Sequence, residues 1–107
     1  MLINSAEPKE EESTDNWMMR LYVAGQTPKS LAAISNIQRL CNKYLAGRFQ
    51  LEIVDLLIHP ELAEGDNIIA VPTLVRKRPG PIRKIIGNIS DTDKTLVALQ
   101  IDAVYSN

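Results

Sequence analysis

The chain has 107 residues, a hydrophobic fraction of 45% and a formal net charge of −1, values typical of one globular domain rather than of a disordered chain. No apolar run approaches the roughly 20 residues that a membrane-spanning helix needs, and the first residues lack the pattern of a secretory signal. One cysteine and one histidine give neither an internal disulfide nor a recognisable metal site. We therefore expect a cytoplasmic protein without membrane association.

The amino-terminal residues 1–16 are strongly acidic. They carry five carboxylates against one lysine, a net charge of −4, whereas the remaining residues have 11 basic and 8 acidic side chains, a net charge of +3. Because the segment also contains Pro8 and few apolar residues, it is predicted to be a disordered acidic tail. Two roles are open for it: a solubilising extension, or a tail that folds back on the basic surface of the predicted domain, residues 17–107.

The domain is predicted to begin with a strand and a helix. Apolar side chains alternate from Trp17 to Val23, which indicates a strand. Thr27 then provides an N-cap oxygen, and Pro28 takes the first helical position, where its missing N–H costs nothing. The helix is expected to run to about Leu45. Its buried stripe is predicted to consist of Leu31, Ile34, Ile37, Cys41 and Tyr44.

A second strand and a short helix are predicted next. Residues 49–57 alternate between apolar and polar side chains over most of their length, which indicates a strand. A strand, a helix and a strand of these lengths favour a right-handed unit whose two strands run parallel. Residues 60–69 then predict a short helix that begins at Pro60 and contains Gly65.

A hairpin and a last helix complete the predicted order. The β-favouring runs 73–78 and 82–86 flank a Pro-Gly-Pro turn and indicate an antiparallel hairpin. Ser90 and Asp93 resemble a capping box for a helix that runs to about Val104. The order βαβαββα predicts a single α/β domain with a mixed sheet covered by helices, which is the thioredoxin-like plan.

The entrance of the first helix has the place of a redox site without its chemistry. Thiol–disulfide exchange needs a thiolate and a partner sulfur, usually in a Cys-x-x-Cys motif at a helix N-terminus. That spacing is occupied by Thr27 and Ser30, whose hydroxyl groups have no redox couple. Cys41 lies on the apolar stripe and is interpreted as a small buried hydrophobe. We therefore expect no catalytic residue and no cofactor.

Pro72 and His59 are two further positions with possible special roles. Pro72 precedes the hairpin at the place where thioredoxin-like folds have a cis-proline, and we expect its peptide bond to be cis, although cis bonds are a minority before proline. His59 has only Glu61 near it in the sequence, and we interpret it as a loop residue rather than a metal ligand.

The predicted hairpin concentrates positive charge. We expect Arg76 and Arg78 to share one face of the sheet, with Lys77 on the other. The hairpin contains no aromatic residue, so it lacks a stacking platform for single-stranded nucleic acid, and no nucleic-acid partner is expected. Two interpretations remain open, a solvated hairpin that discourages edge pairing and a surface that binds an acidic protein. The basic residues concerned are Arg76, Lys77, Arg78, Arg83 and Lys84.

Four segments, residues 21–28, 54–64, 71–74 and 82–87, resemble the KaiB family of small clock and stress regulators. The resemblance covers roughly residues 17–105. It implies a non-enzymatic protein that binds KaiC, a hexameric ATPase of the RecA type. It also implies two folds: a thioredoxin-like βαβαββα state that binds KaiC, and a βαββααβ state that assembles as dimers or tetramers, so self-association is also open.

The last predicted helix bears on which fold is populated. The resemblance implies Gly and Asp in clock members where this chain has Ala98 and Gln100. Ala favours a helix over Gly by about 0.8–1 kcal/mol, and Gln is a somewhat better helix former than Asp. Because two packings of a switching protein differ by only a few kcal/mol, we expect the thioredoxin-like state to dominate. The predicted structural and switch residues are Thr27, Pro28, Pro72, Ala98 and Gln100.

Departures from the family pattern bear on partner choice. The resemblance implies Ala and Lys where this chain has Gln50 and Glu52, and Lys where it has Asn67, at positions in or near partner-binding surfaces. Because like charges across an interface cost several kcal/mol, we expect a cognate KaiC-like ATPase to bind better than a standard clock KaiC. The predicted partner-binding residues are Gln50, Glu52, Asn67, Arg76, Arg83 and Lys84.

Two other functions remain open. One is a stand-alone relative of the KaiB-like sensor domain of clock histidine kinases. The other is an enzyme, either a thioredoxin-like oxidoreductase or a glutathione-dependent enzyme that uses the loop around Pro72. The sequence also leaves open whether the protein serves timekeeping or stress response, and whether it is a monomer, dimer or tetramer.

Overall fold

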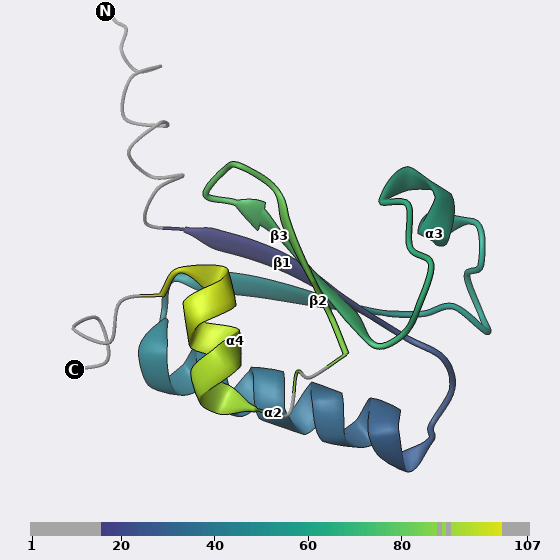
Figure 1. Ribbon diagram of the computed structural model, residues 1–107, viewed down its shortest axis with the longest axis horizontal. Coiled ribbons are helices and arrows are strands. Elements are labelled where there is room, and N and C mark those ends of the chain that lie inside the picture. Colours follow the sequence, from purple (N-terminus) through teal and green to yellow (C-terminus); the bar gives the residue numbers. More distant parts are fainter. Residues whose placement is uncertain (1–15, 88, 90, 102–107) are drawn as a thin grey trace, which may run out of the picture.

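The computed structural model describes residues 16–87, 89 and 91–101 (Figure 1). Its strands are β1 (Trp17–Val23), β2 (Phe49–Asp55), β3 (Thr73–Arg78) and β4 (Arg83–Ile86). Its helices are α2 (Pro28–Tyr44), α3 (Leu62–Gly65) and α4 (Thr92–Leu99). The predicted acidic tail lies outside the described residues except for Asn16. The element order confirms the predicted βαβαββα plan, and the described residues do not have the alternative βαββααβ order.

The strands form one sheet in the order β2-β1-β3-β4. β1 and β2 run parallel, with Trp17 opposite Phe49 and Val23 opposite Asp55. β3 pairs antiparallel with β1, and β4 pairs antiparallel with β3, which confirms the predicted hairpin. The sheet is therefore mixed, as predicted, and the start of β1 lies at the same end as the end of β3.

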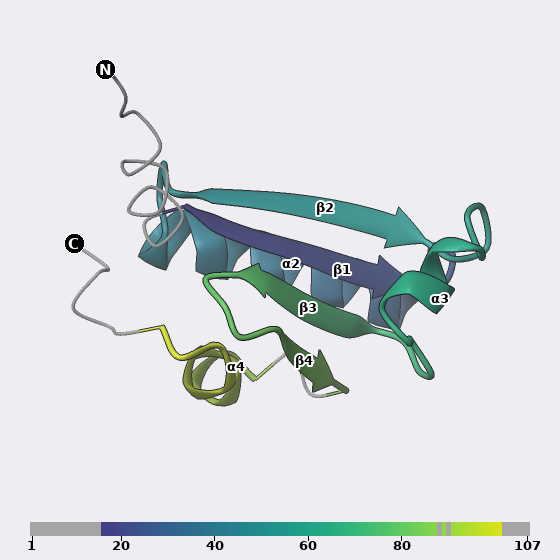
Figure 2. The ribbon, with the colours of Figure 1, turned by 90° about the horizontal axis from the view of Figure 1, so that it is seen from above.

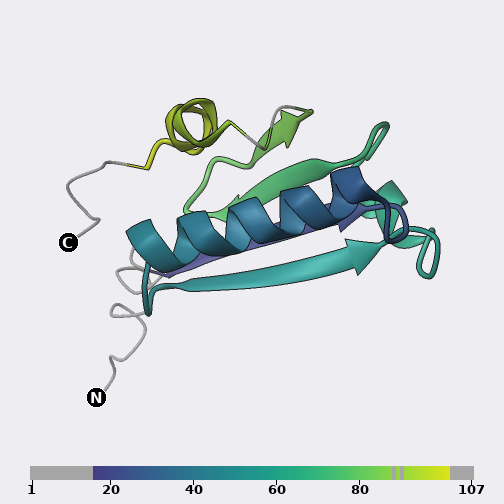
Figure 3. The same cartoon turned by 90° about the horizontal axis from the view of Figure 1, so that it is seen from below.

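Helices α2 and α4 lie on one face of the sheet (Figures 2 and 3). Alternate side chains of β1 point toward them, among which Met19 and Leu21 are almost completely buried. Ile37 of α2 and Leu99 of α4 complete this main core, and both are fully buried. The other face is covered at one end only, where α3 and the chain on either side of it lie (Figure 1).

Thr27 and Pro28 begin α2 as predicted. The Thr27 Oγ1 atom accepts a hydrogen bond of 3.1 Å from the backbone N–H of Ser30, which is the expected N-cap contact. The predicted buried stripe is wrong at Leu31, which is 51% exposed. The helix instead buries the positions one turn apart that face the sheet, namely Ser30, Ala33, Ile37, Leu40 and Cys41.

The second strand ends at Asp55 and not at Leu57 as predicted. The carboxylate of Asp55 accepts hydrogen bonds from the backbone N–H groups of Gly25, at 2.8 Å, and of Leu57, at 2.9 Å. These two bonds turn the chain away from the sheet and fasten it to the loop that precedes α2. Gly25 has a φ of +74°, and a Cβ atom there would lie 2.8 Å from the Leu57 side chain.

The helix predicted over 60–69 is one turn long, Leu62–Gly65. Its continuation is prevented at Asn67, whose φ of 54° is left-handed. The backbone N–H of Ile68 then donates to the carbonyl of Ala63 at 2.9 Å, which closes the turn. The segment consequently crosses the sheet face as a compact loop and returns the chain to β3 through Pro72, whose peptide bond is cis as predicted.

Helix α4 begins and ends at other residues than predicted. Its N-cap is Asp91, whose carboxylate accepts from the Lys94 N–H at 3.1 Å; Ser90 lies outside the described residues. The helix ends at Leu99 because Gln100 is left-handed, with a φ of 61°. The expectation that Gln100 occupies an interior helical position is therefore wrong. Ala98 is inside the helix, as expected.

Candidate partner-binding face

The sheet face opposite α2 and α4 is half covered. Near the carboxyl ends of β1 and β2, Leu62 and Ile68 of the α3 region pack against Tyr22 and Val75, which are fully buried. No described helix covers the other half of this face (Figure 2). We call this uncovered half the open face and define it by the side chains of Met18, Arg20, Gln50, Glu52 and Lys77.

A shallow depression of about 160 Å³ lies on the open face. It is lined by Met18, Met19, Arg20, Gln50, Leu51, Glu52 and Lys77. The pairing between β1 and β3 shifts register between Met18 and Met19, where Lys77 has no partner in the ladder. An irregularity of this kind re-aims side chains. The depression therefore combines apolar side chains with three charged groups on a rigid sheet.

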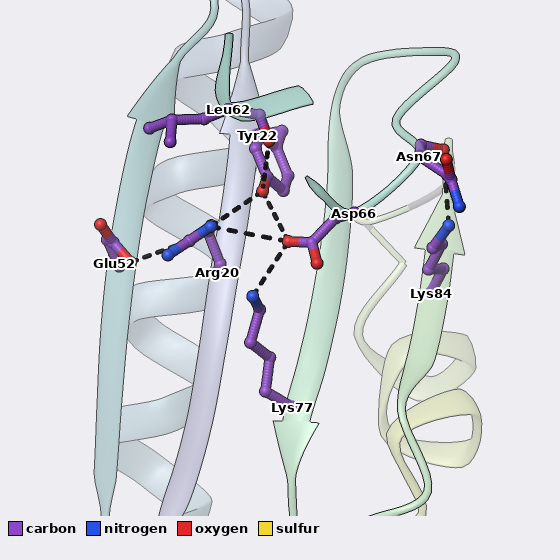
Figure 4. Close-up of polar contacts among 8 residues, drawn as sticks. All are labelled: Arg20, Tyr22, Glu52, Leu62, Asp66, Asn67, Lys77 and Lys84. Atoms are coloured by element: carbon purple, nitrogen blue, oxygen red, sulfur yellow. Dashed lines mark hydrogen bonds and ion pairs between the residues drawn. The ribbon is translucent and has the colours of Figure 1, made fainter. Parts of the chain in front are cut away.

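The boundary between the covered and the open half is a polar cluster around Asp66 (Figure 4). The hydroxyl group of Tyr22 donates to the Asp66 carboxylate at 2.5 Å and lies 3.2 Å from the carbonyl of Leu62. The Nζ atom of Lys77 lies 3.1 Å from the same Asp66 oxygen. Asp66 therefore ties the chain after α3 to both β1 and β3.

Arg20 connects this cluster to β2. Its Nε atom donates to Glu52 at 2.8 Å, and its terminal nitrogen lies 3.1 Å from the Tyr22 hydroxyl and 3.6 Å from Asp66 (Figure 4). The Glu52 side chain is 58% exposed and that of Asp66 is 12% exposed. The contact with Glu52 is thus a screened surface pair of small energy, whereas the contacts of Asp66 are partly sheltered from solvent.

The cluster shifts the pKa values of its members. Burial, followed by the hydrogen bond to Asp66, raises the pKa of Tyr22. Burial alone would raise the pKa of Asp66, but the hydrogen bonds from Tyr22 and Lys77 and the positive charges of Lys77 and Arg20 together lower it. The hydrogen bond to Tyr22 raises the pKa of Arg20. Asp66 therefore carries its charge at neutral pH and holds two cations in place.

Four of the predicted partner-binding residues lie on this side of the sheet. Gln50 and Glu52 are exposed on the open face beside Arg20. Asn67 and Lys84 are exposed next to one another, beyond the Asp66 cluster (Figure 4), where the Lys84 Nζ atom lies 3.4 Å from the Asn67 carbonyl. The structure therefore brings these residues together as two small groups separated by the Asp66 cluster.

Arg76 is not a surface residue, contrary to the prediction. It is 2% exposed and points toward the face covered by α4. Its two terminal nitrogens donate to the carbonyls of Leu99, at 2.6 Å, and Pro81, at 2.9 Å, and its guanidinium group lies 5.4 Å from the centre of the Trp17 ring. Arg76 thus joins α4, the hairpin turn and β1. Arg83 is directly opposite Arg76 in the β3–β4 ladder, so its part-buried side chain points to the same face. It therefore also lies apart from Gln50 and Glu52.

The helix entrance contains no redox chemistry. The Thr27 hydroxyl donates to the Ser30 hydroxyl at 3.0 Å and accepts from the Ser30 backbone N–H, so both side chains take part in capping the helix. Burial raises the pKa of the Cys41 thiol to about 12, and the side chain is completely buried. Because the thiolate is the reactive form, a thiol that burial keeps protonated at neutral pH is poorly suited to disulfide exchange.

The described residues offer no evident metal site or membrane span. His59 is exposed, with its Nδ1 atom 3.4 Å from a Glu61 carboxylate oxygen. Within residues 16–87, 89 and 91–101, no cluster of three or more His, Cys, Asp or Glu side chains could hold a metal ion. In the same residues, no helix is long and apolar enough to cross a membrane.

Sequence reasoning missed the residues that organise the open face. Arg20 and Tyr22 alternate with the apolar side of β1, so their common face was predictable. A tyrosine in a buried strand also needs a partner for its hydroxyl group. Nothing in the sequence indicated that the partner is Asp66, since the two residues are 44 positions apart and the prediction placed Asp66 inside a helix.

Comparison with known proteins relates this chain to one protein family. Residues 20–101 match the family model described as the KaiB domain. The circadian clock oscillator protein KaiB of Microcystis aeruginosa is 41% identical over 85 residues, which cover 79% of this chain and 82% of that protein. The protein of the same name from Trichodesmium erythraeum is also 41% identical over 85 residues, with 79% and 82% covered.

Solved structures resemble the fold at lower identity. The N-terminal domain of SasA from Synechococcus elongatus superposes with a TM-score of 0.64 and 23% identity, over 79% of this chain and 78% of that domain. The germline-specific thioredoxin Deadhead of Drosophila melanogaster superposes with a TM-score of 0.65 and 19% identity, over 89% of both chains. These likenesses establish a thioredoxin-like fold. The family match and the 41% identity to clock proteins show that this chain belongs to the KaiB family.

Proposed function

We propose that this protein is a non-enzymatic regulator that binds a KaiC-like ATPase of the RecA type through the open face, in a clock-like or stress-response system. Membership of the KaiB family supports a regulatory role. The proposal places the protein in the cytoplasm with its ATPase, without nucleic acid, membrane or cofactor. Self-association into a dimer or tetramer is compatible with it.

The observation that carries the proposal is a thioredoxin-like fold whose described residues include no exposed, reactive thiol. The helix entrance holds two hydroxyl groups that bond to each other, and the Cys41 thiol is buried with a raised pKa. A reactive thiolate is what such a fold needs for disulfide exchange. Exposed polar and apolar side chains on a rigid sheet are instead suited to macromolecular recognition.

The open face offers a defined contact surface. Gln50 and Glu52 lie on β2, an edge strand of the sheet, next to the exposed side chain of Met18. The Asp66 cluster holds Arg20 and Lys77 at fixed positions beside them. A preorganised surface loses little conformational entropy on binding. Asn67 and Lys84 lie on the same side of the molecule, beyond the Asp66 cluster, and enlarge the possible contact surface.

A charge reversal on β2 tests the proposal. Glu52→Lys introduces the residue type that the family resemblance implies for clock members, and we expect it to strengthen binding to a purified clock KaiC hexamer in isothermal titration. Asp93→Lys is the matched control, because it also replaces an exposed carboxylate by a lysine, but on α4, across the sheet. We expect no effect of the control. Equal effects of the two variants, or no binding by any form, would count against the proposal.

An enzyme assay separates the rival function. A thioredoxin-like oxidoreductase would reduce the disulfides of insulin in the presence of dithiothreitol, and a glutathione-dependent enzyme would transfer glutathione to an electrophile. We expect neither reaction above the rate without protein. Turnover that disappears in Cys41→Ala would overturn the non-enzymatic assignment.

A further inference from the structure

One end of the sheet concentrates positive charge. Arg76, Arg78 and Arg83, here called the basic end, lie where β3 finishes and β4 starts. Arg76 and Arg83 are directly opposite in the β3–β4 ladder, and like charges in that position repel. Burial, and then the charge of Arg83, lower the pKa of Arg76.

The basic end has no acidic counterpart in the part of the chain that the structure describes. The ion pairs found there involve Arg20, Lys77 and His59, and none involves a residue of the basic end. The Nε atoms of Arg76 and Arg83 are buried without a hydrogen-bond partner. A buried cation without a compensating charge is costly. Arg76 itself is enclosed, so an anionic occupant would meet the charge of the basic end at the exposed Arg78 and the half-buried Arg83.

The opposite end of the molecule has the other sign. Asp55 ends β2, and Glu61, Glu64 and Asp66 follow in the segment around α3, although the charge of Asp66 is already paired with Lys77 and Arg20. Glu61 and Glu64 are exposed. A segment rich in carboxylates, from this chain or from a partner, is consequently repelled from this end and attracted to the basic end.

The chain itself supplies such a segment at the right place. Residues 7–15 contain five carboxylates and one lysine. They precede Trp17, whose ring lies 5.4 Å from the Arg76 guanidinium group, and Met18, which pairs with Arg78. The glutamates at 10–12 are five to seven residues before Trp17, a reach of up to about 17–25 Å. The segment therefore enters the fold beside the basic end.

We propose that the acidic segment 7–15 docks on the basic end of its own chain and compensates its charge. The inference goes beyond partner binding at the open face and does not rest on it. Exposed ion pairs are individually weak and are screened by salt, so the contact is reversible. An acidic partner that approaches the basic end must first displace the segment.

A nitroxide label on the full-length chain tests the proposal. Cys41 is completely buried, so Ser5→Cys provides the thiol that a labelling reagent reaches. Wild-type protein treated with the same reagent should stay unlabelled, which checks that Cys41 does not react. The relaxation enhancement of backbone amide protons is measured at Gly80, between Arg78 and Arg83, and at Gly65, at the acidic end. The matched variant replaces Glu7, Glu10, Glu11 and Glu12 by Gln and keeps the same tether.

We expect the enhancement at Gly80 to be about threefold or more above that of the neutralised variant, because a short tether supplies a millimolar effective concentration. The difference should disappear in about 0.5 M NaCl, where the Debye length is only a few ångströms. At Gly65 the charged chain should show no more enhancement than the neutralised variant. Equal enhancement at Gly80 in the charged and neutralised chains would overturn the proposal, as would a difference of the same size at Gly65.

Discussion

Removal of the Asp66 charge is the perturbation that should disturb the open face most. Asp66→Asn keeps the shape of the side chain and an oxygen that can accept from the Tyr22 hydroxyl. It removes the negative charge that lies 3.1 Å from Lys77 and 3.6 Å from Arg20. Lys77 then loses the carboxylate that it contacts, and Arg20 keeps only the exposed Glu52 as a counter-ion.

The expected size of the effect follows from the burial of the cluster. The Asp66 side chain is 12% exposed, and Lys77 and Arg20 are 32% and 23% exposed, so solvent screens the contacts only in part. A hydrogen bond to a charged group contributes about 1.5–3 kcal/mol. We therefore expect Asp66→Asn to lower the free energy of unfolding by about 1.5–3 kcal/mol, or roughly 6–20 °C in Tm for a domain of this size.

The assay is urea unfolding followed by circular dichroism at several pH values. The folded-state pKa of Asp66 is lowered, so the stabilisation by its charge is fully present above the ordinary pKa of an aspartate, about 3.9. It is lost as the pH falls through the lower pKa of the folded state. The stability difference between wild type and Asp66→Asn should therefore be constant near neutral pH and shrink in acid.

Glu64→Gln is the matched control, since Glu64 is an exposed carboxylate in the same segment. We expect it to change stability by less than about 0.5 kcal/mol. The reasoning is refuted if Asp66→Asn and Glu64→Gln have the same effect. It is also refuted if the loss in Asp66→Asn persists undiminished below the lowered pKa, because the charge would then not be its cause.

Three further predictions concern the fold, each checked by the midpoint of thermal or urea unfolding. Gln100→Gly should raise the free energy of unfolding by about 1 kcal/mol, because a φ of 61° is strained for a residue with a side chain. Ala98→Gly, inside α4, should lower it by about 1 kcal/mol. Changes of the same sign at both positions would contradict a helix that ends at Leu99. Arg76→Met should destabilise by about 2–4 kcal/mol, because it leaves the buried carbonyl of Leu99 and the part-buried carbonyl of Pro81 without a donor. Wild-type stability of the variant would refute that role. Gly25→Ala should lower the free energy of unfolding by about 1–2 kcal/mol, because φ at Gly25 is positive and a Cβ atom there would lie close to the Leu57 side chain. Gly65→Ala should have no such effect, because a Cβ atom at Gly65 meets open space. Equal effects of the two variants would contradict the contact with Leu57.

Local patterns predicted the elements that depend on neighbours in the sequence. The alternation in β1, the cap at Thr27 followed by Pro28, and the hairpin after Pro72 were all correct. In each case the signal and the structure lie within a few residues of one another. Such signals also predicted the element order, and hence the fold.

The failures lie where distant contacts decide. The sequence suggested that Arg76 was a hairpin cation in solvent, but the carbonyls of Leu99 and Pro81 hold it inside. Asp66 was placed within a predicted helix, but the helix is one turn long and the carboxylate meets Tyr22. No periodicity in a single sequence shows which residue will end such a turn or which carbonyl will accept from an arginine.

The switch residues show the same division. Ala98 is helical as its propensity predicts. Gln100 is not, because the backbone N–H of Ile101 donates to Leu96 at 3.0 Å and the chain reverses after Leu99. The helix-propensity argument therefore applies to Ala98 alone, and at Gln100 the relevant quantity is the cost of a left-handed backbone. The preference for the thioredoxin-like arrangement rests on one substitution rather than two.

Hydrogen–deuterium exchange of the full-length protein, with and without a purified KaiC-like ATPase, tests the account most directly. Binding through the open face predicts slower exchange of the backbone amides of β2 around Gln50 and Glu52 and of the segment around Asn67, while the outer surface of α2 exchanges as in the free protein. Protection confined to the exposed side of α2, or unchanged exchange throughout at saturating ATPase, would contradict the account.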